Sequence, residues 1–380
     1  MSGEQLPVVI LSTADFLSDV WTNKQHLAVG LAETREVYYI ESLGLREPVI
    51  SRRDISRIWR RIVRKGKSDP KSSQNAQVPE RLKIISPIVV PYHRFRLVRF
   101  VNFILLRATV WRKLPNRVTL WTFSPITYGL ERRADSIFYH SVDLLHTSAG
   151  LPSTLLLERE RVLIESADSV IASSRVVKDH LLRMGAPEVN LWENVAQVEI
   201  FSDVEVPRKK RAVFAGNLSP HKVDFSLLEE LLDSGIELVV AGPRGIDGST
   251  ELDGMRRVLD HPRCEYVGNL SIPELARVLP SCMVGLIPYQ INDYTNGVFP
   301  MKVYEYLAAG LTVVTTPLPS LDQPINGLRI ADANTFVDEV ESALTGWDEY
   351  QSEASRKEAV GHSWTDRVRS ANALIDGCAG

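Results

Sequence analysis

Short runs of apolar, often β-branched residues alternate along the chain with segments long enough to form helices. The runs are "PVVILS" (7–12), "VYYIES" (37–42), "KIISPIVV" (83–90), "VTLWTF" (118–123), "SIFYHS" (136–141), "SVIASS" (169–174), "AVFAG" (212–216), "ELVVAG" (237–242), "CEYVG" (264–268), "MVGLIPY" (283–289) and "TVVTT" (312–316). Strands that alternate with helices form parallel sheets built from βαβ units. The pattern therefore predicts an α/β protein.

A chain of 380 residues is too long for a single hydrophobic core. The strand series is interrupted at 201–211, "FSDVEVPRKKR", where polar residues and a proline separate two sets of runs. We therefore expect two doubly wound, Rossmann-like domains that face each other across a cleft, one over 1–204 and one over 208–360. Ligands of such sheets bind beyond the carboxyl ends of the strands.

Charge is distributed unevenly along the chain. Residues 46–113 contain 18 Lys or Arg and four acidic residues, whereas the formal charge of the whole chain is only −3. The segments 52–67 and 94–114 mix these cations with large apolar side chains, a composition that fits a peripheral anionic membrane surface. The alternative is that the apolar side chains pack into the N-terminal domain and the cations form a solvated face. Nucleic acid is not expected, because no helix-turn-helix or aromatic single-strand module occurs.

The remaining bulk features favour the cytoplasm. No apolar run approaches the ~20 residues of a membrane span, and the N-terminus lacks the pattern of a signal peptide. The three cysteines, Cys264, Cys282 and Cys378, have no CxxC spacing, so we expect reduced and mostly buried thiols.

The stretch "NDYTNGVFPMKVYEYLAAGLTVVTTP" (292–317) predicts a short helix with Pro300 at its start and Gly310 just past its end. The N-terminus of such a helix attracts anions, and Lys302 would add a full charge within reach of a phosphate. The simpler interpretation is that Lys302 and Glu305, three residues apart, form an ion pair within the helix.

Several segments, in order, resemble the GT-B glycosyltransferases, particularly family 4. They are "ADSVIASSRVVKDHLLRMG" (167–185), "ENVAQVEIF" (193–201), "VFAGNLSPHKVD" (213–224), "ELVVAGP" (237–243), "CEYVGNLSIPELARVLPSCMVGLIPY" (264–289) and "FPMKVYEYLAAGLTVVTT" (299–316). The likeness is good over 211–317, weak over 8–45 and absent over 48–120. It implies that the helix over 361–380 crosses back to the N-terminal domain.

The resemblance also implies a site for a nucleotide-sugar donor in the C-terminal domain. Glu305 would bind the ribose, and Lys222 and Lys302 would bind the diphosphate, Lys222 also acting in catalysis. Two positions depart from the family, because Asn217 replaces an arginine and Gly297 replaces a second glutamate. The implied donor-binding residues are Asn217, Lys222, Gly242, Asn269, Tyr289, Thr295, Asn296, Gly297, Val298, Lys302 and Glu305.

The N-terminal domain would bind the acceptor. His140 and Asp143 follow an apolar strand, where relatives have a histidine or aspartate near the reacting sugar, so they are candidate catalytic residues. Candidate acceptor contacts lie in 15–28, namely Asp19, Trp21, Lys24 and His26. The alternative is that His140 and Asp143 are ordinary packed or solvated residues, and that the residues in 15–28 cap the first helix and pack against it.

Taken together, the resemblance implies a metal-independent glycosyltransferase that moves a sugar to a glycan, a lipid-linked or another acceptor, with retention. No cofactor is expected, because the nucleotide-sugar is a co-substrate, and no Asp-x-Asp metal motif occurs. A nucleotide-sugar 2-epimerase of the same fold and a non-catalytic binding protein are the alternatives.

Overall fold

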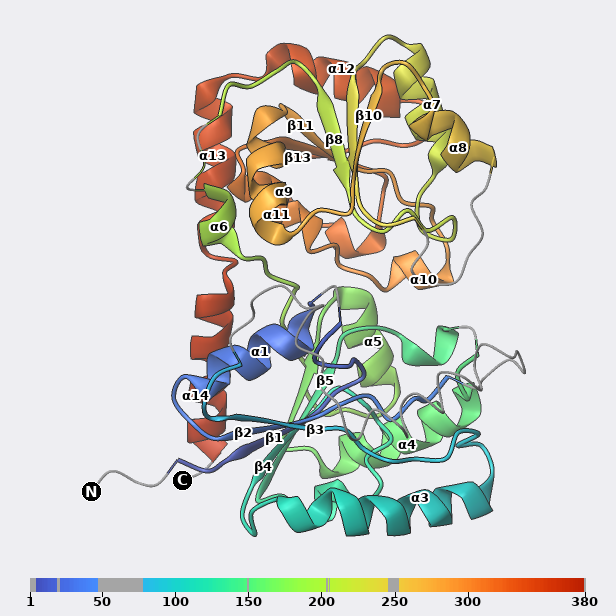
Figure 1. The fold of residues 1–380 in the computed structure, drawn as a ribbon, viewed down its shortest axis with the longest axis vertical. Coiled ribbons are helices and arrows are strands. Elements are labelled where there is room, and N and C mark those ends of the chain that lie inside the picture. Colours follow the sequence, from blue (N-terminus) through green and yellow to red (C-terminus); the bar gives the residue numbers. More distant parts are fainter. Residues whose placement is uncertain are drawn as a thin grey trace. The chain divides into compact units, whose positions relative to one another are not determined.

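A computed structural model describes residues 5–18, 21–46, 78–148, 150–202, 204, 206–244 and 253–378. The chain forms two compact units (Figure 1): a first unit of Met1–Trp192 with Val368–Gly380, and a second unit of Glu193–Arg367. The division falls before the predicted boundary at 204, because Ala196, Val198 and Phe201 are buried in the core of the second unit. The basic segment 52–67 lies outside the described residues.

The first unit contains a seven-stranded parallel sheet in the order β3-β2-β1-β4-β5-β6-β7. Its strands are β1 (Val8–Leu11), β2 (Val37–Ile40), β3 (Leu82–Ile85), β4 (Thr119–Thr122), β5 (Ser136–Ser141), β6 (Ser169–Ala172) and β7 (Asn190–Leu191). Strands buried on both faces, such as β1 and β2, are apolar without alternation, as expected for a sheet covered by helices on both sides.

Helices cover both faces of this sheet. They are α1 (Asn23–Ala32), α3 (Arg96–Thr109), α4 (Ser153–Ser166), α5 (Arg175–Arg183) and the last helix, α14 (Trp364–Cys378). One buried cluster joins the sheet to α3, α4 and α5. A second cluster joins it to α1 and to Ala371 and Ile375 of α14, so the end of the chain completes the core of the first unit.

The second unit contains a six-stranded parallel sheet in the order β10-β9-β8-β11-β12-β13. Its strands are β8 (Ala212–Ala215), β9 (Leu238–Ala241), β10 (Cys264–Gly268), β11 (Val284–Ile287), β12 (Thr312–Thr315) and β13 (Leu328–Ile330). Its helices are α6 (Val198–Ser202), α7 (Phe225–Asp233), α8 (Asp253–Leu259), α9 (Ile272–Val278), α10 (Asp293–Asn296), α11 (Lys302–Ala308), α12 (Phe336–Gly346) and α13 (Glu349–Val360).

The predicted fold class, two doubly wound parallel-sheet domains, is confirmed. Each of the eleven predicted runs contains a strand, whereas β7 and β13 were not predicted. Only two and three residues long, these strands have too little apolar pattern to be recognised. Among the described residues, no helix is both long and apolar enough to cross a membrane.

Candidate functional site

The strand order of the second unit creates a switch point between β8 and β11. From β8 the chain proceeds to β9 and β10 on one side, and β11, β12 and β13 follow on the other side. Crevices for ligands form at such a point, beyond the carboxyl ends of the strands. The loops that follow β8 and β11 are therefore the place to look for a site.

Backbone hydrogen bonds join these two loops. Val223 and Tyr289 form an antiparallel bridge, and Gln290 donates its backbone N–H to the carbonyl of Lys222 at 2.9 Å. The ammonium of Lys222 lies 4.5 Å from the centroid of the Tyr289 ring, a cation–π contact. Two of the predicted donor-binding residues, far apart in sequence, therefore meet at this edge.

The loop after β11 contains a short helix that we had not predicted. Asn292 caps α10, its side-chain oxygen accepting from the backbone of Tyr294 and Thr295 at 3.0 Å. Thr295 is fully buried, and its hydroxyl donates to the carbonyl of Gln290. This hydroxyl, a predicted sugar contact, is thus engaged within the loop, whereas the side-chain oxygen of Asn296 is buried without a hydrogen-bond partner in the described structure.

Helix α11 begins at Lys302, two residues after Pro300, and Gly310 follows its end with φ +74° as the sequence predicted. The Lys302 Nζ and the Glu305 Oε2 lie 2.8 Å apart, and both side chains are largely buried. The Lys302 chain passes beside Gly216, where an added Cβ would come within 3.8 Å of its Cε. The ion pair of the simpler interpretation therefore exists, and it lies next to the end of β8.

Tyr306 fixes α11 against β8, a role that the sequence did not indicate. The ladder between β8 and β11 ends at the pair Gly285–Val213, so Ala215 has no strand partner on that side. The fully buried Tyr306 hydroxyl instead accepts from the Ala215 backbone N–H at 2.8 Å. Nothing in a helical tyrosine distinguishes this role from ordinary packing before the fold is known.

Glycines shape the neighbouring strand ends. Gly216 donates its N–H to Ala241 at 2.8 Å, and Gly242 donates to Gly268 at 2.7 Å. Gly242 has φ +137°, and an added Cβ would lie 1.9 Å from the carbonyl oxygen of Gly216. Only glycine fits there. Of the other predicted donor residues, Asn217 directly follows Gly216, and Asn269 is exposed directly after Gly268.

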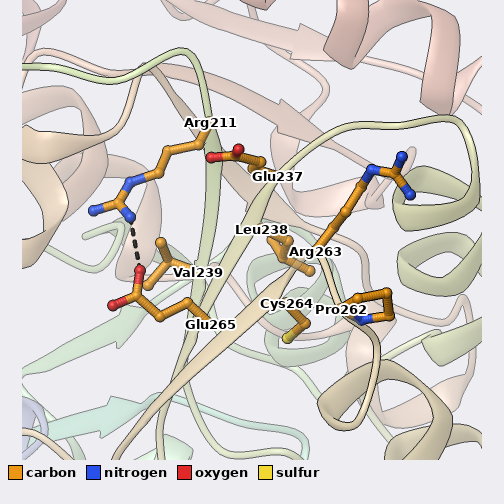
Figure 2. A pocket seen from close by; sticks show the side chains of 8 residues that line it. All are labelled: Arg211, Glu237, Leu238, Val239, Pro262, Arg263, Cys264 and Glu265. Carbon is orange, nitrogen blue, oxygen red and sulfur yellow. Dashed lines mark hydrogen bonds and ion pairs between the residues drawn. The ribbon is translucent and has the colours of Figure 1, made fainter.

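The hydrogen-bonded loops and α11 thus gather most of the predicted donor residues at one edge of the sheet. A different hollow of about 200 Å³ lies among the amino ends of β8, β9 and β10 (Figure 2) and is lined by residues such as Arg211 and Glu265, which are paired at 2.7 Å. It opens at the opposite edge of the sheet from the donor residues, so we do not assign the donor to it.

In the first unit, His140 is buried at the end of β5 among three aromatic rings. The centroids of Phe123, Trp121 and Trp192 lie 4.9, 6.0 and 6.1 Å from that of the imidazole. His140 therefore packs among aromatic rings close to the carboxyl end of the sheet, and its predicted catalytic role stays a prediction.

Of the candidates in 15–28, Lys24 lies beside the Phe123 ring, and Trp21 and His26 contact each other. Lys24 is buried, its ammonium lies 5.8 Å from the centroid of Phe123, and burial lowers its pKa while the charge of Asp143 partly opposes the shift. Trp21 contacts His26 edge to face at 5.4 Å, and burial lowers the pKa of His26 to about 4. Asp19 lies outside the described residues.

One group of side chains in the described structure could hold a metal ion, namely His146, Glu160 and His180. His180 and Glu160 are already joined at 2.7 Å, and Tyr139 donates to the other oxygen of Glu160. Burial, then the charge of His180, lowers the pKa of His146. These hydrogen bonds explain the burial of Glu160 and His180 without a metal, and His146 stacks on His180 with the ring centroids 4.7 Å apart.

The thiols are free, but only Cys282 is buried. Cys264 is partly exposed, and burial raises its pKa to about 11, which suppresses the reactive thiolate. Cys378 is exposed, so the expectation of mostly buried thiols was wrong.

Known proteins share this architecture. The family described as "Glycosyl transferases group 1" matches residues 209–346. The putative teichuronic acid biosynthesis glycosyltransferase TuaH of Bacillus subtilis is 29% identical over 208 residues, which are 49% of this chain and 51% of the relative. The alignment thus spans about half the length of that relative.

Solved structures match over nearly the whole chain. Sucrose-phosphate synthase of Thermosynechococcus elongatus has a TM-score of 0.69 at 15% identity, covering 98% of this chain and 99% of its own. Anabaena HepE in complex with UDP-glucose has a TM-score of 0.62 at 12% identity with the same coverage. The fold is therefore GT-B, and the predicted resemblance to glycosyltransferases of this fold is confirmed.

Proposed function

We propose that this chain, whose residues 209–346 match the group 1 glycosyl transferases, moves a sugar from a nucleotide-sugar to a glycan or lipid-linked acceptor. The observation that carries the proposal is the convergence of Lys222, the loop over 292–298 and the Lys302–Glu305 pair at the carboxyl edge of the sheet. UDP-glucose, the ligand in the HepE structure, makes uridine nucleotide-sugars the first donors to test.

The proposed roles follow from the chemistry of the leaving group. A departing nucleoside diphosphate develops negative charge, which fixed cations stabilise most where water is scarce. Two lysines supply that charge. The backbone carbonyl of Lys222 accepts a hydrogen bond from Gln290, which holds its loop in place, and Lys302 lies beside Gly216. Glu305 accepts from the ribose hydroxyls when the donor draws Lys302 to its phosphate.

The sugar would be held by the loop after β11. The side-chain oxygen of Asn296, which has no partner among the described residues, would accept from a sugar hydroxyl, and the glycine at 297 leaves the backbone accessible where relatives have a glutamate. Thr295, engaged with Gln290, shapes the loop instead of contacting the donor through its hydroxyl. In the first unit, we assign Asp143 and Lys24 to the acceptor side, with Trp21 and His26 behind them.

A screen of nucleotide-sugars with purified protein tests the proposal, with nucleoside diphosphate release as the signal. Lys222→Ala should lower turnover by about 10² to 10³, the usual loss when a charge-stabilising donor is removed. Lys210→Ala, an exposed lysine of the same unit, is the matched control and should not change turnover. Equal turnover of both variants would contradict the assignment.

Product analysis separates the remaining alternatives. We propose retention, so the anomeric configuration of the transferred sugar should match that of the donor. Release of free nucleotide with an altered sugar and no acceptor would indicate a 2-epimerase. No binding of any nucleoside diphosphate in calorimetry would indicate a non-catalytic protein. We also propose metal independence, so EDTA should leave turnover unchanged.

A further inference from the structure

Helix α3 of the first unit exposes apolar side chains on its outer side. Its buried side contains Leu106 and the fully inaccessible Asn102, whereas Leu97 and Phe100 are 74% and 61% exposed. Ile104 and Val101 are 49% and 38% exposed. An amphipathic helix on a globular protein normally turns its apolar stripe toward the core, so the arrangement of α3 requires a separate explanation.

Specific hydrogen bonds hold the helix in this orientation. The Asn102 side chain accepts from the Val90 backbone N–H at 2.7 Å and donates to the Val90 carbonyl at 2.9 Å. It also donates to the Tyr128 hydroxyl at 3.2 Å, and Tyr128 has φ +53°, an unusual conformation for a tyrosine. Rotation of α3 to bury its apolar side would break these bonds and leave buried polar groups unpaired.

The exposed apolar residues form one continuous stripe. Leu97, Phe100, Val101 and Ile104 have the spacing i, i+3, i+4 and i+7, which places them on one side of the helix. Figure 1 shows α3, in teal, at the margin of the first unit. We define this set of four side chains as the α3 stripe.

Cations border the stripe. Arg96 precedes Leu97 and Arg107 lies one turn beyond Ile104, and both arginines are exposed. Arg112 and Lys113, also exposed, follow the helix. No acidic residue occurs anywhere between positions 81 and 130, so neighbours along the chain cannot neutralise these charges.

We propose that the α3 stripe and its flanking cations dock the protein on an anionic lipid bilayer. Apolar side chains bordered by Arg or Lys are the composition of helices that lie in the plane of a membrane interface, with the cations at the level of anionic headgroups. A second copy of the chain fits less well, because a symmetric contact would bring the arginines of both copies together with no local carboxylate between them.

The proposal goes beyond sugar transfer, and its test needs no sugar. The full-length protein is sedimented with vesicles of phosphatidylcholine, with and without phosphatidylglycerol. Binding should be strong only with phosphatidylglycerol and should weaken as salt is raised. Each arginine contributes about fivefold to partitioning, so Arg96→Gln with Arg107→Gln should weaken binding about 25-fold.

The apolar part is tested by combining Leu97→Gln, Phe100→Gln and Ile104→Gln, because glutamine preserves helix propensity. This variant should lose at least about 100-fold in binding with unchanged circular dichroism. Val360→Gln, a 63% exposed residue of α13 in the second unit, is the matched control and should bind like the wild type.

Three results would overturn the proposal. They are no binding of the wild type to anionic vesicles, equal binding of the triple-glutamine variant, and a wild-type dimer in solution that the same variant converts to a monomer. Turnover of a soluble nucleotide-sugar remains unaffected in each case, so failure here is distinct from failure of the proposed activity.

Discussion

Tyr306→Phe removes one oxygen atom from the interior of the second unit and probes how α11 is attached to the end of β8. The hydroxyl is the partner of the Ala215 backbone N–H at 2.8 Å, at a position where the strand ladder toward β11 has already ended. Phenylalanine fills the same space, so packing against Gly285 is preserved. What is lost is the acceptor of that buried N–H, together with the longer hydrogen bond that the hydroxyl donates to the Ala215 carbonyl at 3.4 Å.

The expected loss of stability follows from the buried backbone N–H of Ala215. A buried N–H left without a partner costs about 1–3 kcal/mol, and about 1 kcal/mol lowers the melting temperature by about 2–4 °C in a unit of this size. Tyr306→Phe should therefore melt about 2–12 °C below the wild type. Hydrogen exchange at the Ala215 amide should accelerate as well, because local opening exposes it directly.

Tyr350→Phe is the matched control, since Tyr350 is in the same unit and 82% exposed. It should leave melting and exchange unchanged. If Tyr306→Phe melted within 1 °C of this control, and the Ala215 amide exchanged at the wild-type rate, the hydroxyl would not be the attachment that we describe. Weaker nucleotide binding by Tyr306→Phe alone would further link this attachment to the donor site.

Two further predictions concern stability. Gly242→Ala should destabilise the protein by about 2–6 kcal/mol in thermal unfolding, the sum of backbone strain at φ +137° and overlap with the Gly216 carbonyl. Gly346→Ala is the control and should be neutral, because Gly346 has open space around it. His26 has a pKa of about 4 when folded, below its ordinary 6.5, so the unfolded state takes up the proton first as pH falls. Stability should therefore decrease from pH 6.5 to 4 by up to about 3 kcal/mol, and His26→Gln should lose that part of the pH dependence in melting curves.

The sequence predicted those parts of the fold that depend on local pattern. Four-residue apolar runs such as "VVIL" and "LVVA" marked strands because a parallel sheet buries both faces. Gly310 marked the end of α11 because few other residues adopt φ +74°. The rule that ligands of such sheets bind beyond the carboxyl ends of the strands also indicated the edge of the second sheet at which the loops after β8 and β11 converge.

What the sequence could not predict depends on contacts between distant residues. The hydrogen bond from Ala215 to Tyr306 joins residues 91 positions apart, and no local pattern encodes it. Thr295 is buried in α10, which Asn292 caps, in the stretch before Pro300 where the sequence predicted no helix. The exposure of the apolar stripe of α3 depends on the hydrogen bonds between Asn102 and Val90, whereas the composition of 94–114 indicated apolar and basic residues that fit a membrane surface without showing which of them are exposed.

The Lys302–Glu305 pair shows why the structural and functional interpretations of a motif need not compete. An exposed pair of this spacing stabilises a helix by only about 0.3–0.5 kcal/mol, but these side chains are 23% and 14% exposed, so each charge needs a partner. Without a donor, the two residues satisfy each other. If the donor binds as we propose, its diphosphate would pair with Lys302 while ribose hydroxyls donate to Glu305, so no charge would be left unpaired. A ligand with only one of these groups would leave the other side chain without a partner, so we expect the pair to favour complete nucleotides over free phosphate or free ribose.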